Sequence, residues 1–199
     1  SLTVRVPDNV EVVAADVLQV DLAAVIGAGE PVRVAGNLPY GISTPILARL
    51  LELSDGGGRI RDATVMLQRE VADRLAAEPG GREWGVLSAC QQLRADVEAV
   101  LRLPPGAFRP PPKVHSAVVR LTYHAASPPV PDVGLFEKLV RSLFTQRRKM
   151  LTNALASFAT ARAIEPAEAL ARSNLDGRRR PETLSLEELA RLADVFLSL

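Results

Sequence analysis

The sequence is poor in cysteine and histidine, and it has no long apolar run. A single cysteine, Cys90, cannot form an internal disulfide, which excludes a disulfide-stapled secreted domain. No apolar segment approaches the roughly 18 residues of a membrane helix, and the first residues do not follow the pattern of a signal peptide. A content of 47% hydrophobic residues among 199 is enough for a substantial core. We therefore expect a soluble cytoplasmic protein, monomeric and without membrane contact.

Charge is distributed unevenly along the chain, although the net charge is only +1. Residues 1–98 carry 9 Lys or Arg against 14 Asp or Glu, residues 99–164 carry 10 against 2, and residues 165–199 carry 5 against 7. A strongly basic middle section is typical of a solvated face, but it is also what a phosphate backbone attracts.

The first part of the sequence alternates valine-rich runs with amphipathic stretches. Short apolar runs bounded by polar or glycine-containing segments predict buried parallel strands, and the stretches between them predict helices, so the pattern indicates an α/β sheet. The expected buried parallel strands are 11–16, 32–37 and 63–68, and 95–103 and 116–124 are expected as further strands. The expected helices are 43–53, with Ser43 and Thr44 as caps and Pro45 in the first turn, and 69–77.

The last part of the sequence is predicted to be helical only. Residues 125–134 contain several prolines and no long apolar run, so we interpret them as a linker. Beyond them apolar residues recur at spacings of three and four, and Ser185 with Glu188 has the spacing of a helix capping box. This predicts a sheet-containing domain over 1–124 and a helical domain over 135–199.

The tetrapeptide Asn37–Leu38–Pro39–Tyr40 follows an expected strand, at the position where ligands bind in an open α/β sheet. The amide oxygen of Asn37 and the carbonyl of Leu38 can accept the two hydrogens of an adenine amine, Pro39 stiffens the turn, and Tyr40 offers a stacking surface. Four residues recur by chance, however, and an ordinary strand-to-helix turn with a structural tyrosine is an equal alternative.

Five motifs in order resemble one family, the ribosomal RNA adenine dimethyltransferases of the bacterial small-subunit type. They are GNLPYGISTPILARLL, VMLQREVADRLAAEPG, FRPPPKVHSAVVRL, FTQRRKMLTNAL and RPETLSLEELARLA. The resemblance implies a Rossmann-like class I methyltransferase domain, incomplete at its N-terminus, followed by a small all-α domain. It also implies transfer of methyl groups from S-adenosyl-L-methionine to the exocyclic amines of two adjacent adenosines near the 3′ end of small-subunit rRNA, with a role in ribosome biogenesis.

The same resemblance assigns roles to individual residues. It gives the roles described above to Asn37, Leu38, Pro39 and Tyr40. Phe108 then packs on the other face of the target base, so that Tyr40 and Phe108 hold the base between them, as in base-flipping enzymes. Asp16 receives the adenine amine of S-adenosyl-L-methionine, with the backbone of Val17 beside it; the alternative is a turn aspartate. The proline run after Phe108 is alternatively a polyproline ligand for another protein.

The front of the family pattern is not found in this sequence. The family begins with a strand and a glycine-rich loop around the methionine part of the cofactor, and then an acid for the ribose hydroxyls. The glycine cluster 56–58 follows an expected helix, which predicts a surface loop and not a cofactor turn. We therefore expect Ser1 to lie within the domain. No metal and no general base is assigned, and His115 and His124 are expected to be structural or solvated.

Six cations are expected to contact RNA. Helical cations position an RNA backbone without reading its sequence, and the alternative is a solvated helix face. The residues are Arg109 and Lys113 beside the base clamp, and Arg141, Arg147, Arg148 and Lys149 in a helical stretch.

Two other functions stay open at this point. One is the related antibiotic-resistance type of enzyme, which methylates a large-subunit adenosine. The other is a ribosome-assembly factor that binds the small subunit without catalysis, which the missing cofactor loop favours.

Overall fold

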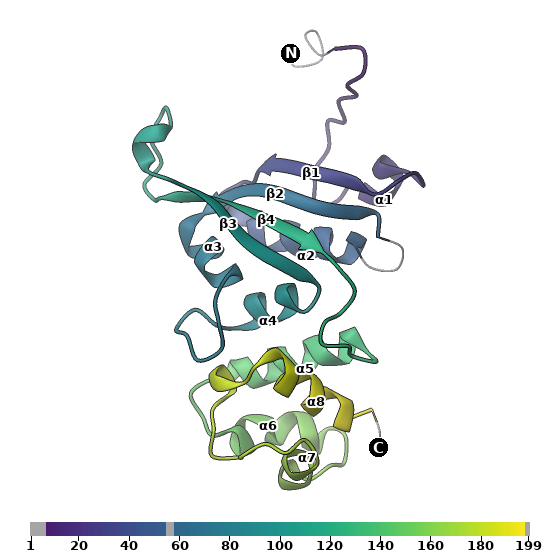
Figure 1. The fold of residues 1–199 in the computed structure, drawn as a ribbon, viewed down its shortest axis with the longest axis vertical. Coiled ribbons are helices and arrows are strands. Elements are labelled where there is room, and N and C mark those ends of the chain that lie inside the picture. Colours follow the sequence, from purple (N-terminus) through teal and green to yellow (C-terminus); the bar gives the residue numbers. More distant parts are fainter. Residues whose placement is uncertain (1–6, 55–57, 198–199) are drawn as a thin grey trace.

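Four strands form one mixed sheet in the computed structural model, which describes residues 7–54 and 58–197 (Figure 1). Their spatial order is β1-β2-β4-β3. The first pair is parallel, whereas β4 runs antiparallel to both of its neighbours. The strands are β1 (Val32–Asn37), β2 (Ile60–Gln68), β3 (Ala95–Leu103) and β4 (Ser116–Tyr123).

Four of the five expected strands are confirmed. The strands expected at 32–37 and 95–103 have those bounds, the one at 116–124 is one residue shorter, and the one at 63–68 begins three residues earlier.

The strand expected at 11–16 is wrong. Those residues form no strand, and Val12 and Val13 are 38% and 48% exposed. A strand satisfies its backbone groups only beside a neighbour, and no described strand pairs with this segment. A valine-rich composition alone does not supply that neighbour.

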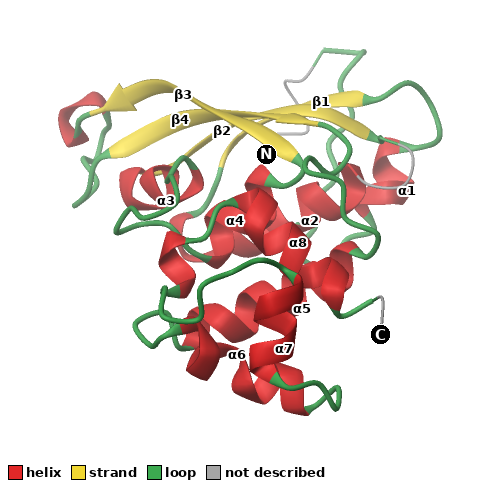
Figure 2. Ribbon diagram, turned by 60° about the horizontal axis from the view of Figure 1, so that its bottom comes forward, coloured by secondary structure: helices red, strands yellow, loops and turns green. Residues whose placement is uncertain are grey.

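One face of the sheet is covered by helices α2 (Ser43–Ser54), α3 (Arg69–Leu75) and α4 (Val86–Gln92) (Figure 2). The buried side chains between these layers include Leu47, Ile60, Leu67 and Leu121, none more than 1% exposed. Among the described residues no helix covers the opposite face (Figure 2). The strands are therefore not buried on both faces as expected, and β1 alternates half-buried and exposed positions.

The start of α2 differs from the expected cap. A single 3₁₀ turn, η2 (Tyr40–Ile42), runs directly into the helix, and Ser43 already has helical dihedral angles. Its hydroxyl donates to the carbonyl of Tyr40 at 3.3 Å, so Ser43 lies inside the helix and does not act as its N-cap. Pro45 does lie in the first turn, where a missing amide hydrogen costs little.

The C-terminal part is helical, as expected. The capping box is confirmed, because the Ser185 hydroxyl accepts from the Glu188 amide and the Glu188 carboxylate accepts from the Ser185 amide. No helix in the described residues is both long and apolar enough to cross a bilayer. The helices are α5 (Val133–Thr145), α6 (Leu151–Thr160), α7 (Pro166–Arg172) and α8 (Leu186–Val195), with a short α1 (Leu22–Ile26) near the start and 3₁₀ turns η3 (Pro105–Ala107) and η4 (Pro181–Thr183).

The helical core also takes in side chains that precede the proposed linker. Trp84, Cys90 and Leu93 pack in the same buried cluster as Phe136 and its neighbours on α5 to α8. The α4 helix therefore touches the sheet on one side and α5 on the other (Figure 1). Since α5 begins at Val133, the last residues of the proposed linker are helical; the division into two domains stays a prediction.

Candidate active site

Asn37 ends β1 at the carboxyl edge of the parallel strand pair. It lies beside Met66 of β2 in the register, and the next amide, that of Leu38, donates to the Met66 carbonyl at 2.9 Å. This bond fixes the backbone where the strand ends. The Asn37 side chain is exposed and makes no hydrogen bond within the described residues, so its amide oxygen is available to a ligand.

Tyr40 is anchored by a residue that the sequence analysis did not identify. Its hydroxyl lies 2.7 Å from the hydroxyl of Ser116, which is fully buried at the start of β4. The two residues are 76 positions apart, and a lone serine after a proline run carries no local signal. The bond restricts the phenol ring, so a base that stacks on it meets a surface of fixed orientation.

Phe108 comes to the same place from the other side of the chain. It follows η3 in the loop between β3 and β4, which projects beyond the end of the sheet (Figure 1). A cavity of about 250 Å³ lies between this loop and the turn after β1. It is lined by Asn37, Leu38, Pro39, Tyr40, Met66, Phe108, Pro110 and Pro112.

The cavity therefore brings together all five residues predicted for catalysis and adds Met66, Pro110 and Pro112. It combines an amide oxygen, a strand-end carbonyl and two aromatic rings, which are the groups needed to hold a planar amine-bearing base by its face and its edge. The alternative of an ordinary turn with a structural tyrosine is also compatible with the Tyr40–Ser116 hydrogen bond, so the role of these five residues stays a prediction.

Asp16 and Val17 do not line this cavity. The Asp16 carboxylate accepts from the Leu18 amide at 2.8 Å and from the Gln19 side chain at 3.0 Å, as a turn aspartate does. Arg49 of α2 donates to the carbonyl of Val17 at 2.6 Å, which fastens this segment to the helix that begins after the Asn37–Tyr40 turn.

The expected basic helix is in part a turn. Arg141 lies on α5, but that helix ends at Thr145, so residues 147–149 form the connection to α6. Residues 146–149, Gln-Arg-Arg-Lys, are all good helix formers, but the Gln146 backbone leaves the helical region at φ −123° and ψ 33°.

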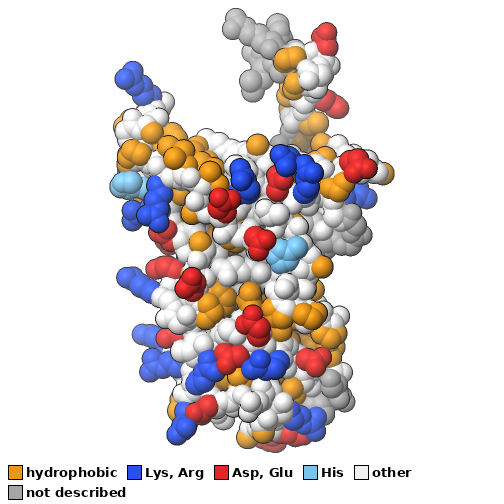
Figure 3. All heavy atoms as spheres, viewed as in Figure 1, with side chains coloured by type: hydrophobic (Ala, Val, Ile, Leu, Met, Phe, Trp, Pro, Cys, Tyr) orange, Lys and Arg blue, Asp and Glu red, His pale blue; other side chains and the backbone are white. Residues whose placement is uncertain are grey.

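The cations of this region differ in their partners. Arg147 is engaged within the protein, because its Nε lies 2.9 Å from the Glu182 carboxylate and its Nη2 lies 3.0 Å from the Arg82 carbonyl. Arg148 and Lys149 are exposed, and neither makes an ion pair among the described residues. Arg109 and Lys113 are exposed in the loop around Phe108. Lys and Arg side chains gather along one edge of the molecule (Figure 3).

Known proteins resemble this chain along most of its length. The model of the family described as ribosomal RNA adenine dimethylase matches residues 1–194. The ribosomal RNA small subunit methyltransferase A of Pseudomonas fluorescens is 47% identical over 180 residues, which is 90% of this chain and 63% of that protein. Its counterpart in Idiomarina loihiensis is 44% identical over 94% of this chain and 62% of that protein. The chain thus spans less than two thirds of the length of these curated relatives.

Solved structures share the fold. A dimethyladenosine transferase from Plasmodium falciparum matches with a TM-score of 0.75 at 22% identity, covering 93% of this chain and 71% of that one. The 23S rRNA methyltransferase ErmE matches with a TM-score of 0.64 at 26% identity, covering 94% and 72%. The expected methyltransferase-like α/β fold with C-terminal helices is confirmed. With its five motif residues gathered at one cavity and the family model matched almost from end to end, the chain belongs to the ribosomal RNA adenine dimethylase family.

Proposed function

We propose that this chain is the base-binding and RNA-binding part of an enzyme that dimethylates the exocyclic amines of two adjacent adenosines near the 3′ end of small-subunit rRNA. The observation that carries the proposal is the cavity shared by Asn37, Leu38, Tyr40 and Phe108. Relatives named small subunit methyltransferases, at 44% and 47% identity, support the same substrate.

The residues of the cavity act on a weak nucleophile. The lone pair of the adenine amine is delocalised into the ring, so orientation and acceptor hydrogen bonds must lower the barrier. The Asn37 amide oxygen and the Leu38 carbonyl accept the two amine hydrogens, which directs the nitrogen lone pair toward the methyl donor. Tyr40 and Phe108 hold the ring between them, and the Ser116 hydroxyl keeps Tyr40 in place.

The residues present fit one end of the methyl donor, S-adenosyl-L-methionine, whose sulfonium supplies the methyl group and a good leaving group. An ionised carboxylate has about four lone-pair sites, and Asp16 uses two of them in its turn, so it retains capacity for the cofactor's adenine amine. Val17 would lie beside that amine and Asn37 at the reacting end. Residues for the methionine and ribose portions are not identified in this chain.

Arg148 and Lys149 are proposed as the main phosphate contacts of the helical part, with Arg141 beside them, and Arg109 and Lys113 as phosphate contacts of the loop around Phe108. Arg147 is expected to contribute less to RNA binding than the sequence alone suggested, because its guanidinium already binds the Glu182 carboxylate and the Arg82 carbonyl. If this ion pair must break before Arg147 contacts a phosphate, its loss offsets most of the free energy that the new contact provides.

Salt dependence separates these roles. Replacing Arg148 or Lys149 by glutamine should reduce the slope of log K against log salt for small-subunit binding by about one each, whereas Arg147→Gln should change it by much less. Filter binding between low and moderate salt measures the slope. Arg172→Gln on α7, also a charge removal, is the control and should leave it unchanged. Equal slopes for all four variants and the unmodified chain would rule out this contact surface.

The two alternative functions predict different results in a methyl-transfer assay. The likeness to the 23S rRNA methyltransferase ErmE keeps a large-subunit substrate as the second candidate. A non-catalytic assembly factor would bind the small subunit and methylate neither.

The deciding experiment is methyl transfer to small subunits that lack the modification, with nucleosides analysed by mass spectrometry. It uses this chain and the same chain extended upstream. Dimethyladenosine from the extended chain supports the proposal. Methylation of large-subunit rRNA alone favours the second candidate, and subunit binding without any product favours the assembly factor.

A further inference from the structure

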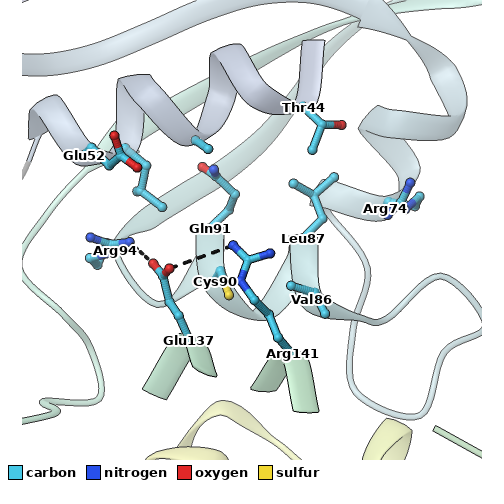
Figure 4. Close-up of a pocket in the computed structure, with 12 residues that line it drawn as sticks. Thr44, Glu52, Arg74, Val86, Leu87, Cys90, Gln91, Arg94, Glu137 and Arg141 are labelled. Carbon is cyan, nitrogen blue, oxygen red and sulfur yellow. Dashed lines mark hydrogen bonds and ion pairs between the residues drawn. The ribbon is translucent and has the colours of Figure 1, made fainter. Parts of the chain in front are cut away.

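A cavity enclosed by α2, α4 and α5 is separate from the candidate active site. Its volume is about 280 Å³, and it shares no lining residue with the cavity that contains Asn37 (Figure 4). Within it Glu137 lies 2.6 Å from Arg94 and 3.9 Å from Arg141, so these charged groups bind one another. A group that acts on the target base must therefore come from the residues around Asn37.

Met66 lines the cavity around Asn37, but the roles proposed above leave its side chain unused. The residue lies in β2, opposite Asn37 in the register of the parallel pair. Its carbonyl accepts from the Leu38 amide at 2.9 Å, so its backbone fixes the end of β1. This contact accounts for the backbone of Met66 and not for its thioether side chain.

Met66 and Asn37 present their side chains to the same face of the sheet. Side chains alternate between the two faces along a strand, and Ala63, Val65 and Leu67 of β2 are fully buried against the helices. Met66 is out of phase with these three residues, so its side chain lies on the opposite face, which no helix covers among the described residues (Figure 2). Asn37, the residue opposite it, shares that face. Neighbouring strands lie about 4.8 Å apart, which brings the Met66 side chain within reach of a group bound to the Asn37 amide.

Met66 does not belong to a hydrophobic core. It is half-buried, and neither hydrophobic cluster of the described residues includes it. Leu38, another apolar residue of the cavity, is 8% exposed and belongs to the cluster between the sheet and its helices. Methionine is unbranched and polarisable, so it adapts its shape to the group that it contacts. The apolar surface of Met66 is therefore available to a molecule in the cavity.

The row of side chains that begins at Asn37 is apolar beyond that residue. Met66 is opposite Val118 of β4, and Val118 is opposite Leu101 of β3. Val118 is half-buried, and Leu101 is 52% exposed. A substituent of the bound base that extends from Asn37 toward β2 thus meets a thioether and not a hydrogen-bonding side chain.

Dimethylation changes what the site must hold between its two steps. Adenosine presents two hydrogens on its exocyclic nitrogen, N6, and Asn37 and Leu38 are the two acceptors proposed for them. After the first transfer, N6 carries one hydrogen and one methyl group. The second transfer therefore needs one acceptor and one apolar contact, and Met66 is an apolar residue beside Asn37 in the same cavity.

We propose that the Met66 side chain contacts the first methyl group during the second transfer and thereby determines that the product is dimethyladenosine. The inference rests on the proposed function. The remaining N6 hydrogen binds the Leu38 carbonyl, and the methyl group lies against the thioether of Met66. As the new N–C bond forms, the S–C bond of the methyl donor breaks with its electron pair on sulfur, and the last N6 proton leaves to solvent.

Single-turnover methyl transfer to small subunits separates the two steps, because mass spectrometry quantifies monomethyladenosine and dimethyladenosine over time. All variants are made in the chain extended upstream. In Met66→Gln, where the side chain is polar and of nearly the same length, the second transfer should slow about tenfold more than the first, the lower end of what one methyl group in an apolar pocket contributes. Met66→Leu stays apolar and should keep the ratio of the two rates close to that of the unmodified chain.

Met150 provides the matched control. It is the other methionine of this chain, it directly precedes α6, and it is 48% exposed. It does not line the cavity. The same substitution, Met150→Gln, should therefore leave both transfers unchanged.

Binding followed by NMR tests the contact without catalysis. Carbon-13 labelling of methionine methyl groups gives a signal for Met66, which is assigned by its absence in Met66→Leu. The probes are adenosine 5′-monophosphate and N6-methyladenosine 5′-monophosphate. The Met66 signal should shift saturably with the methylated nucleotide, which should bind about fourfold more tightly, the fold-change for burial of one methyl group. Met66→Gln should bind the two nucleotides equally.

The inference and the proposed function fail on different results. Dimethyladenosine from the unmodified extended chain, with the ratio of the two rates unchanged in Met66→Gln, would overturn the inference alone. Equal slowing of both transfers would also overturn it, because Met66 would then support the adenine ring or the fold. Equal affinity of the unmodified chain for the two nucleotides would do the same. No dimethyladenosine from the unmodified extended chain would overturn the proposed function and the inference with it.

Discussion

Asn37→Ala, made in the chain extended upstream, should lower kcat for methyl transfer to the small subunit by about 10²–10³, the usual loss for one preorganised hydrogen-bonding group at a reacting centre. The substitution removes one of the two acceptors proposed for the adenine amine. Only the Leu38 carbonyl then remains as an acceptor. Orientation of the nitrogen lone pair is then lost, although the base still stacks between Tyr40 and Phe108.

The variant is informative because it should not unfold the protein. Asn37 is exposed and its side chain makes no hydrogen bond among the described residues, so the change in stability should stay within about 0.5 kcal/mol. Single-turnover methyl transfer measures the loss, and subunit affinity should stay within twofold. Asn153→Ala, at an exposed asparagine of α6, is the matched control and should keep full activity.

Two results would contradict the role assigned to Asn37. An unchanged kcat would mean that the amide does not act on the nucleophile. A loss of subunit affinity equal to the loss of rate would mean that Asn37 positions the RNA and does not activate the amine.

Phe136→Ala should reduce the free energy of unfolding by about 3–5 kcal/mol, a large share of the 5–15 kcal/mol typical of a folded domain. Phe136 is fully buried on α5, in the cluster that also contains Trp84 and Leu93 from the sheet side. Removal of the ring leaves a cavity at the contact of the two parts of the molecule. Both parts should therefore lose stability together.

The single tryptophan makes this measurable. Trp84 is fully buried in the same cluster, so its fluorescence reports on the contact, while far-UV circular dichroism reports on all helices and strands. In chemical denaturation the two signals should move together to a lower midpoint in Phe136→Ala. Phe108→Ala is the control, because Phe108 lies half-buried in the candidate active site outside both cores.

Two separate transitions by the two signals, with only the fluorescence shifted, would show that the helical part unfolds alone. That result would support the proposed division at residues 125–134 and contradict the shared core as a stabilising contact.

Most of the secondary structure could be predicted from local sequence, and the exceptions depend on contacts or turns that local sequence does not reveal. Apolar periodicity and capping residues are local properties, so the helices of the C-terminal part, the Ser185 capping box and four of the five strands could be predicted. The segment 11–16 could not, because a strand exists only where another strand pairs with it. The end of α5 was missed for another local reason: residues 146–149, Gln-Arg-Arg-Lys, are all good helix formers and include no glycine or proline that would mark the end of a helix.

In the candidate site, the sequence by itself determined which residues are proposed to carry the chemistry. The motif around Asn37 and the run after Phe108 were identified before any contact between them was known. Only the tertiary structure decided that they share one cavity, that Ser116 anchors Tyr40, and that Arg147 is paired with Glu182. Each of these contacts joins groups that are 35 or more residues apart in the sequence. The fold of the intervening chain brings them within hydrogen-bonding distance or into one cavity, and no local spacing in the sequence encodes that fold.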